Sequence, residues 1–219
     1  MGSIPLHLRP DVHAVQVEAD VVLLDIAADR YLCLPGAGGL LTVGPGRAIE
    51  AHEPAAAEGL VGAGLAGLGA VMPDRPCPPP SPARSALDGH AAEPLTFPEV
   101  GALLGAWLDL LRHYRGRTFA QIVVYIARGH RPSSAERRAA ALRLAAKFER
   151  AAIWLPAPRK CLVRSFLLLR FLQRRGADAQ WVLGVRTWPF AAHCWAQVGD
   201  VALDDVPERL VGYRPICVV

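Results

Sequence analysis

The alternation of apolar and polar positions predicts a small antiparallel sheet near the start of the chain. Residues 13–34 read HAVQVEADVVLLDIAADRYLCL, in which β-branched and other apolar residues alternate with polar ones. Glu18–Asp20 and Ala27–Asp29 interrupt this stretch. Alternation with a period of two is typical of strands that bury one face. We therefore expect a three-stranded meander, with strands near residues 13–18, 21–26 and 30–34.

Helical patterns follow this meander. Pro35-Gly36 ends the third strand, and residues 38–43 are apolar enough to predict a short helix. Residues 54–68, PAAAEGLVGAGLAGL, are rich in alanine and place apolar residues at helical spacing, which predicts another helix. A module of this size buries a thin core, so we expect it to depend on a partner domain or a ligand for stability.

A proline-rich segment divides the chain into two parts. Residues 73–94 read PDRPCPPPSPARSALDGHAAEP, and each proline fixes φ and removes a backbone donor. Neither a helix nor a sheet is expected to cross such a segment. We predict one domain over residues 1–75, a semi-rigid linker over 76–94 and a second domain over 95–219.

The second domain opens with amphipathic helical patterns. Residues 97–114 place their large apolar side chains on one stripe. Residues 133–152 form the next pattern, with Ser133 as a candidate N-cap and Glu136 three residues later. Both segments are predicted to be helices with one buried face.

A more apolar helix and a group of strands complete the second domain. Residues 161–175 are apolar over most of their surface and end at Gly176, a suitable residue after a helix, so we expect a central buried helix. Strand composition follows at residues 180–185, 193–198 and 201–203. The predicted fold class is α+β.

Composition and charge exclude several classes of protein. The 219 residues are 52% hydrophobic and 20% charged, a balance that supports a folded core and excludes a wholly disordered or fibrous chain. The net charge of +4 divides into −5 for residues 1–90 (5 Arg, 10 Asp or Glu) and +9 for residues 91–219 (19 Lys or Arg, 10 Asp or Glu). The basic half carries no nucleic-acid motif, so we expect no nucleic-acid partner.

The location of the protein is also predicted from the sequence. No stretch reaches the roughly 18 apolar residues of a spanning helix, and the start of the chain lacks the pattern of a secretion signal. We expect a cytoplasmic protein with no membrane partner. The 5 cysteines are irregularly spaced and include no CxxC pair, so we expect reduced thiols and no metal site.

Three residues of the second domain form a candidate site for nucleophilic catalysis: Cys161 begins a helix, His193 begins a strand and Asp205 follows the hairpin. A helix N-terminus favours a thiolate, and Arg159-Lys160 would add positive potential. An imidazole can share the proton and later donate it, and a carboxylate can fix the imidazole tautomer. The order Cys, His, Asp is that of papain-like and transglutaminase-like thiol enzymes.

The register of the hairpin decides which aspartate faces the histidine. If the hairpin is centred on Gly199, then Asp205 lies opposite His193. If the turn is instead a two-residue Gly199-Asp200 loop, Asp204 lies on the histidine face. The sequence leaves both registers open.

These motifs resemble the transglutaminase-like leader peptidases of lasso-peptide biosynthesis, which are called B proteins. The resemblance lies in residues 160–176 (KCLVRSFLLLRFLQRRG), 189–198 (PFAAHCWAQV) and 203–205 (LDD). They match a Cys at a helix start, a PF-x-AH-x-W strand and an acidic pair whose first residue is often Asn. The resemblance covers most of residues 97–219 and implies a papain/transglutaminase-like cysteine peptidase domain.

The resemblance also implies a role for each site residue. Cys161 would be the nucleophile, His193 the base and Asp205 the acid that orients it. Trp195 is a candidate substrate contact, with a place in the core or the cleft wall as the alternative. Cys194 is expected to be a core residue that points away from His193, because neighbours in a strand face opposite sides.

The first domain resembles the leader-binding module of ribosomal-peptide maturation, a small winged helix-turn-helix called the RiPP recognition element. Residues 21–34 carry the resemblance, which implies that the leader adds as a strand to the sheet edge. Asp25, Tyr31 and Leu34 are the candidate contacts for the leader, although Tyr31 and Leu34 could equally fill the small core. The acidic first part could attract a leader that carries Lys or Arg.

Together these resemblances imply a cysteine peptidase that binds the leader of a lasso-precursor peptide and cleaves it from the core. A separate asparagine-synthetase-like cyclase would then close the macrolactam. Two alternatives remain: a non-catalytic escort that only binds the leader, and an acyl transferase that forms the same thioester. No cofactor is expected from the residues. The family resemblance allows ATP dependence, although the sequence contains no nucleotide-binding motif.

Overall fold

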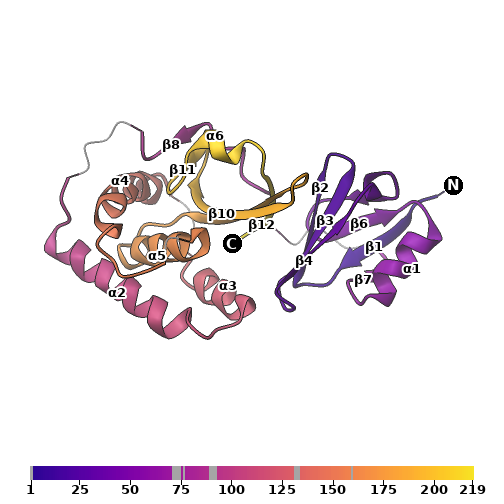
Figure 1. Ribbon diagram of the computed structural model, residues 1–219, viewed down its shortest axis with the longest axis horizontal. Coiled ribbons are helices and arrows are strands. Elements are labelled where there is room, and N and C mark those ends of the chain that lie inside the picture. Colours follow the sequence, from indigo (N-terminus) through magenta and orange to yellow (C-terminus); the bar gives the residue numbers. More distant parts are fainter. Residues whose placement is uncertain (1, 71–74, 76, 89–92, 131–133, 159) are drawn as a thin grey trace. The chain divides into compact units, whose positions relative to one another are not determined.

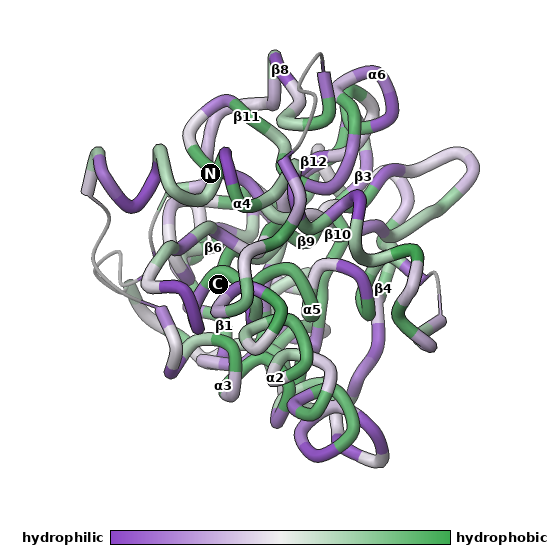
Figure 2. Tube along the Cα trace, turned by 90° about the vertical axis from the view of Figure 1, so that its left-hand side faces the viewer, coloured by the Kyte–Doolittle hydropathy of each residue, from purple (hydrophilic) through white to green (hydrophobic). Residues whose placement is uncertain are grey.

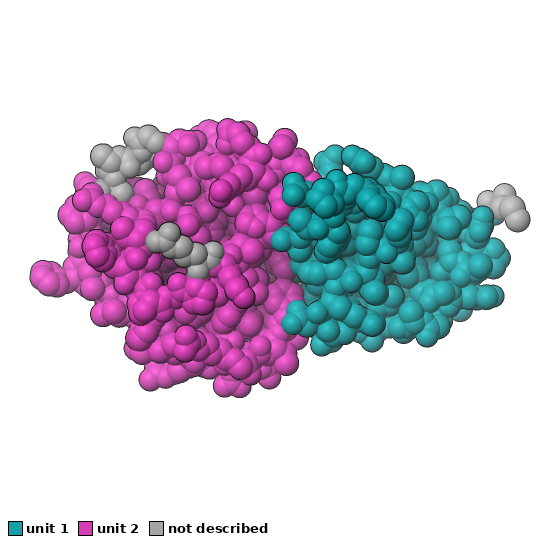
Figure 3. All heavy atoms as spheres, in the orientation of Figure 1, with its two compact units in different colours: residues 1–78, 184–192, 214–218 teal, residues 79–183, 193–213, 219 magenta. Residues whose placement is uncertain are grey.

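The computed structural model describes residues 2–70, 75, 77–88, 93–130, 134–158 and 160–219. The fold is mixed α and β, in agreement with the predicted α+β class (Figure 1). The chain divides into two compact units (Figure 3). Unit 1 comprises Met1–Pro78, Gly184–Ala192 and Arg214–Val218, and unit 2 comprises Pro79–Leu183, His193–Tyr213 and Val219.

Unit 1 contains the predicted meander. The three strands are β2 (Val12–Val17), β3 (Asp20–Asp25) and β4 (Arg30–Leu34), and they pair in the order β2-β3-β4. Each lies within one residue of its predicted bounds. The turns contain Glu18 and Asp29, which have φ values of 53° and 50°. The polar interruptions in the sequence thus mark the turns, and strand β4 forms one edge of this sheet.

A second sheet in unit 1 was not predicted. It consists of β5 (Leu41–Val43), β6 (Ala48–Ala51), β1 (Ile4–Leu8) and β7 (Ala66–Leu68), in that order. The two sheets and helix α1 (Pro54–Gly62) share one hydrophobic core. Its fully buried members include Leu6, Val21, Leu23 and Ile49.

Two helix predictions for unit 1 are wrong in extent. Residues 38–43 form one 3₁₀ turn, η1 (Ala37–Gly39), followed by strand β5, because paired glycines disfavour a longer helix. The helix predicted to reach Leu68 ends at Gly62, and Gly64 has a φ of 66° that helical backbone cannot adopt. The described part of residues 1–78 therefore holds one α-helix. The winged helix-turn-helix, which needs two successive helices, is not confirmed.

Unit 2 contains a group of helices around α5 (Cys161–Arg174). Helix α2 (Phe97–His113) begins with a capping box of Thr96 and Glu99, and α4 (Ala135–Ala152) begins with Ser134 as its N-cap. The predicted cap, Ser133, lies outside the described residues. Helix α3 (Phe119–Ala127) was not predicted. Helices α2, α3 and α4 all contact α5, whose middle is buried and hydrophobic (Figure 2).

The chain also forms a five-stranded sheet, with the strand order β12-β9-β10-β11-β8. Its strands are β9 (Gln180–Arg186), β10 (Ala191–Val198), β11 (Val201–Ala202), β8 (Arg84–Ser85) and β12 (Arg214–Val218), and a short helix, α6 (Pro207–Leu210), follows β11. Strand β8 lies within the predicted linker and pairs parallel to β11. The linker prediction therefore missed a strand, which begins two residues after Pro82. Of the helices that the structure describes, none has the length and apolar character needed to cross a membrane.

Candidate active site

The start of helix α5 places Cys161 in a cavity. Cys161 is the first helical residue, and its N-cap, Lys160, offers no side-chain hydrogen bond to the first turn. The unpaired N–H groups of that turn therefore favour negative charge nearby. The half-buried thiol lines a cavity of about 200 Å³ in unit 2. The cavity is lined by Leu87, Cys161, Arg164, His193, Cys194, Asp204, Asp205, Val206 and Arg209.

The three predicted catalytic residues meet in this cavity. Nε2–H of His193 donates a hydrogen bond to Oδ2 of Asp205 over 2.6 Å. The imidazole also hydrogen bonds to the thiol of Cys161, which leaves Nδ1 as the nitrogen that faces sulfur. The other carboxylate oxygen of Asp205 accepts the backbone N–H of Val206 over 2.8 Å and lies 3.8 Å from the guanidinium of Arg209. These contacts fix the carboxylate, and through it the imidazole.

The electrostatics favour a thiolate–imidazolium pair. Hydrogen bonds from Cys194 and His193 lower the pKa of Cys161 from its ordinary value of 9.0 to about 4, although burial opposes this. Hydrogen bonds to Asp205 and Cys161 raise the pKa of His193 from 6.5 to about 9. Burial raises the pKa of Asp205, but the hydrogen bonds from His193 and Val206 outweigh it and hold that pKa below its usual range. At neutral pH the sulfur is therefore negative and the imidazole positive.

Cys194 is a residue of this site that the sequence analysis misplaced. Its thiol contacts the sulfur of Cys161, and its backbone also hydrogen bonds to that sulfur. The sulfur of Cys161 thus lies beside the backbone of strand β10, where the side chains of both His193 and Cys194 reach it. The alternation of side chains between the two faces of a strand therefore does not keep Cys194 away from the site. Contact with Cys161, together with burial, raises the pKa of Cys194, so it remains a neutral thiol that can donate.

The hairpin has the two-residue Gly199-Asp200 turn, yet Asp205 is the partner of His193. Val198 pairs with Val201, and Gly199 has a φ of 59°. That register would place Asp204 on the histidine face if the strand continued. However, β11 ends at Ala202, and the next three residues form a bend. Alternation therefore no longer applies at the two aspartates.

Asp204 has a separate, structural position. It is only 7% exposed, accepts the hydroxyl of Ser165 over 2.6 Å and accepts the backbone N–H of Ala196 over 2.8 Å. Burial raises its pKa to about 6. The carboxyl group thus connects helix α5 to strand β10 at the wall of the cavity. Ser165 was missed by the sequence analysis, although a serine four residues after Cys161 in an apolar helix was a usable signal.

Trp195 lies too deep for the predicted substrate contact. It is 1% exposed, and its indole N–H donates to the side chain of Gln197 over 2.7 Å. Its ring stacks on His193, with ring centroids 6.2 Å apart and an interplanar angle of 25°. The prediction is corrected: Trp195 supports the imidazole from the core side, because strand β10 turns this face inward.

The predicted leader contacts all lie in unit 1. Asp25 is 2% exposed, accepts the N–H of Ala28 over 3.0 Å and pairs with Arg9 and Arg30, so its carboxylate holds the β3–β4 turn. That placement contradicts a direct contact with a ligand. Leu34 packs against the core of the unit.

Tyr31 is the predicted leader contact that lies beside further aromatic side chains. It is half-buried, and its ring lies 5.8 Å from that of Phe190, centroid to centroid. Phe190 is 45% exposed and Trp188 is 75% exposed, while the indole N–H of Trp188 donates to Asp20 over 2.8 Å. Phe190 and Trp188 belong to the β9–β10 connection, which the sequence analysis did not assign to this module.

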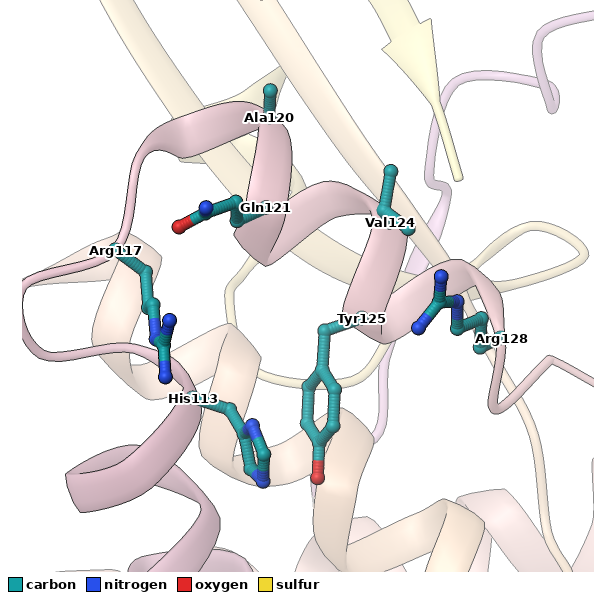
Figure 4. Close-up of a pocket in the computed structure, with 7 residues that line it drawn as sticks. All are labelled: His113, Arg117, Ala120, Gln121, Val124, Tyr125 and Arg128. Atoms are coloured by element: carbon teal, nitrogen blue, oxygen red, sulfur yellow. The ribbon is translucent and has the colours of Figure 1, made fainter.

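A larger cavity lies elsewhere in unit 2 (Figure 4). Its volume is about 400 Å³, and it is lined by His113, Arg117, Ala120, Gln121, Val124, Tyr125 and Arg128. Two guanidinium groups make it basic, and the ring of His113 stacks on Tyr125 with centroids 4.2 Å apart. The lining contains no thiol or carboxylate, so the candidate chemistry belongs to the smaller cavity around Cys161.

Comparison with known proteins agrees with this geometry. Residues 104–218, which contain all three catalytic candidates, match the family model of the transglutaminase-like superfamily. The chain belongs to the transglutaminase-like superfamily. It is also 47% identical over 48 residues to the microcin J25-processing protein McjB of Escherichia coli. These findings confirm the family resemblance that the motifs indicated.

The extent of the second match is limited. The 48 matched residues are 22% of this chain and 23% of McjB, so the match spans about a quarter of that relative. No solved structure matches the chain.

Proposed function

We propose that this member of the transglutaminase-like superfamily is a cysteine peptidase that removes the leader from a ribosomally made lasso-precursor peptide. The observation that supports this most is the hydrogen-bonded series Cys161, His193, Asp205 in one open cavity. A thiolate beside an imidazolium is the nucleophile and acid pair that amide cleavage needs. The name of the relative McjB, which describes processing of a peptide, agrees with this activity.

The proposed reaction begins at the sulfur. The thiolate of Cys161 attacks the carbonyl carbon of the scissile amide, and the carbonyl oxygen becomes an oxyanion. As the C–N bond breaks, His193 donates its Nδ1 proton to the leaving amine, which becomes the new N-terminus of the core peptide. The leader remains as a thioester on Cys161. His193 then accepts a proton from water, the hydroxide attacks the thioester carbonyl, and the thiolate leaves.

Backbone groups at the start of α5 supply part of the oxyanion stabilisation. The N–H of Cys161 belongs to the first turn, where it has no intrahelical acceptor. The helix dipole favours an anion near this end of the helix, so the N–H is the proposed first donor to the oxyanion. Asp205 acts through His193, because its carboxylate fixes the ring and stabilises the imidazolium before each proton transfer.

Recognition of the leader is proposed for the edge of strand β4. The two-residue turn between β2 and β3 is closed by the pair Val17 and Asp20, so even-numbered positions of β3 direct their backbone groups toward β2. Odd-numbered positions therefore face β4, where they pair with Arg30, Leu32 and Leu34. The backbone groups of the residues between them face the outer edge, as strand addition by a peptide requires.

The aromatic side chains near this edge suit the same ligand. Tyr31 lies on β4, and Phe190 and Trp188 extend the apolar surface beside it within unit 1. Such rings give a peptide side chain a large contact area at little entropic cost. In this proposal the leader gains affinity from main-chain hydrogen bonds and specificity from the aromatic contacts.

The cleaved core peptide needs a partner enzyme. Cleavage exposes an α-amine, and macrolactam formation joins that amine to a side-chain carboxylate that must first be activated. We propose that a separate asparagine-synthetase-like cyclase consumes the product.

Mass spectrometry of the reaction products tests the peptidase proposal. The purified protein, as wild type, Cys161→Ala and Cys77→Ala, is incubated with a lasso-precursor peptide, which we expect its gene neighbourhood to encode. We expect loss of the leader with the wild type and with Cys77→Ala, since Cys77 is exposed and far in sequence from the site. Cys161→Ala should leave the precursor intact. Binding without any cleavage would favour an escort, and a gain in mass equal to an added amine would favour an acyl transferase.

Backbone methylation tests strand addition. A set of leader peptides, each N-methylated at one residue, is compared for binding to the intact protein. Because alternate N–H groups of an added strand pair with the sheet edge, we expect affinity to fall at every second residue over the bound segment. A uniform response, or none, would contradict the β4 edge as the binding surface.

A further inference from the structure

Arg164 lies between two cavities of unit 2. It follows Cys161 by three residues in α5, so the two side chains occupy neighbouring positions on one helix face. The Arg164 side chain lines the cavity of Cys161 and also a second cavity of about 110 Å³, which we call the α4–α5 cavity. The α4–α5 cavity is lined by Phe148, Glu149, Ala152, Ile153, Ala157, Pro158, Arg164 and Leu167. Arg164 is thus the residue that the two linings share.

The α4–α5 cavity has the size and lining of a side-chain pocket. Apart from Glu149 and Arg164, every residue that lines it is apolar. An apolar cavity of about 150 Å³ holds one benzene molecule. A volume of about 110 Å³ therefore suits a branched aliphatic side chain better than a phenyl ring.

Glu149 and Arg164 form the polar wall of the α4–α5 cavity. Nη2 of Arg164 donates to Oε2 of Glu149. Two further atoms of these side chains, Oε1 of Glu149 and Nε of Arg164, are buried without a hydrogen-bond partner. Such atoms are rare in folded proteins, because each loses the hydrogen bond it makes in water.

An acceptor and a donor without partners are complementary to a peptide backbone. A backbone amide supplies one N–H and one C=O, the groups that Oε1 and Nε need. Burial raises the pKa of Glu149, which agrees with a carboxylate that lacks part of its solvation. The Arg164 side chain lines both cavities, so a group bound in the α4–α5 cavity lies next to the cavity of Cys161.

We propose that the α4–α5 cavity is the specificity subsite of this enzyme. It receives a Val, Ile or Leu side chain of the substrate close to the scissile bond, while Glu149 and Arg164 hold the adjacent backbone amide. Glu149 and Arg164 would then be binding and positioning residues outside the Cys161–His193–Asp205 series. This inference rests on the proposed peptidase function and adds the class of side chain that the enzyme selects.

Filling the cavity tests the subsite. Precursors are prepared with Ala, Val, Leu or Phe at each of the positions that flank the cut, and kcat/KM is measured with wild type and Ala152→Leu. At one position the kcat/KM of the wild type should be about tenfold or more higher for Val or Leu than for Ala or Phe. One or two methyl groups buried in an apolar pocket change kcat/KM by about this much. Ala152→Leu should abolish this preference, because its side chain occupies the cavity.

Matched variants exclude an indirect effect. Ala139→Leu makes the same change on an exposed position of α4 and should behave as wild type. Ala157→Leu fills the cavity from the loop before α5 and should reproduce Ala152→Leu. Glu149→Gln should raise KM more than it lowers kcat, because the substrate backbone loses a contact that is present before the reaction. All variants should retain the alkylation rate of Cys161 by iodoacetamide.

The outcomes separate the two proposals. If the wild type cleaves no precursor, the peptidase function itself is overturned. If the wild type cleaves but Ala152→Leu and Ala157→Leu keep the full aliphatic preference, or the wild type shows no such preference, the subsite is overturned.

Discussion

The sulfur of Cys161 is held as a thiolate by two neighbours, the imidazole of His193 and the thiol of Cys194. The contribution of Cys194 is unusual, because a second cysteine acts as a hydrogen-bond donor inside a thiol active site. The donor is buried and stays neutral, so it can stabilise the charge without competing for it.

Removal of this donor should make Cys161 less acidic. In Cys194→Ala we expect the pKa of Cys161 to rise from about 4 by about one to two pH units, since a hydrogen bond to a charged group contributes about 1.5–3 kcal/mol. The pH dependence of alkylation by iodoacetamide, measured in a Cys77→Ala background, reports this pKa. Cys217→Ala, which removes a buried thiol in unit 1, is the control and should leave the midpoint unchanged.

The pH profile of kcat/KM should be a bell with limbs near pH 4 and pH 9. Activity falls below about pH 4 because the thiolate of Cys161 gains a proton, and above about pH 9 because the imidazolium of His193 loses one. In Asp205→Asn the amide can still accept from Nε2–H, but it carries no charge. We expect the alkaline limb to move down from about 9 toward the ordinary histidine value of 6.5. An unmoved alkaline limb would refute the role of Asp205.

Sequence spacing was sufficient to predict that Cys161, His193 and Asp205 lie together, but not which residues surround them. Cys161 is the first residue of α5 and His193 lies near the start of β10, so the motif and the predicted elements agree there. The choice between Asp204 and Asp205 depended on how far strand β11 extends, and a two-residue strand carries no periodicity from which to read its end. The contact between Cys194 and Cys161 depends on where the N-terminus of α5 lies along β10. This is a feature of the tertiary packing, which no local sequence pattern encodes.

At the scale of elements, Asp204 joins α5 to β10. Its carboxyl group accepts one hydrogen bond from each, through Ser165 and Ala196. In Asp204→Ala both donors lose their partner inside the protein, and we expect a loss of about 2–4 kcal/mol in the free energy of unfolding. Urea denaturation measures this loss. Asp205→Ala should affect cleavage far more than stability, and equal destabilisation by both variants would contradict the division of roles.

Long periodic elements were predictable, whereas short ones were not. The meander, α2 and α5 were placed closely because each carries several repeats of its period. The sheet of β1, β5, β6 and β7 was missed because strands of three to five residues contain too few alternations to stand out. Helix α3 was missed for a similar reason: its nine residues, FAQIVVYIA, are apolar on most sides, and β-branched residues there favour a strand by composition.

At the scale of the whole molecule, charge is unevenly distributed along the chain. Residues 1–90 carry a net charge of −5, and most of these residues belong to unit 1. A leader that carries Lys or Arg should therefore bind more weakly at high ionic strength, because salt screens exposed charges over about 10 Å at 0.1 M.

Fluorescence anisotropy of a labelled leader measures this effect. Between about 50 mM and about 500 mM sodium chloride we expect the Kd of a basic leader to rise several-fold. A leader whose Lys and Arg residues are replaced by Gln is the control and should respond little. Equal salt responses of the two peptides would contradict electrostatic attraction.

Unit 1 takes its residues from three separate stretches of the polypeptide, and one of them ends at Ala192, immediately before His193. No single cut in the chain can therefore separate the two units. A chimera that exchanges only the first 78 residues with a relative would combine that foreign module with a β9–β10 connection and a last strand from the original parent. Under the proposed function, redirecting the protein to a new leader therefore requires that all three stretches be transplanted together.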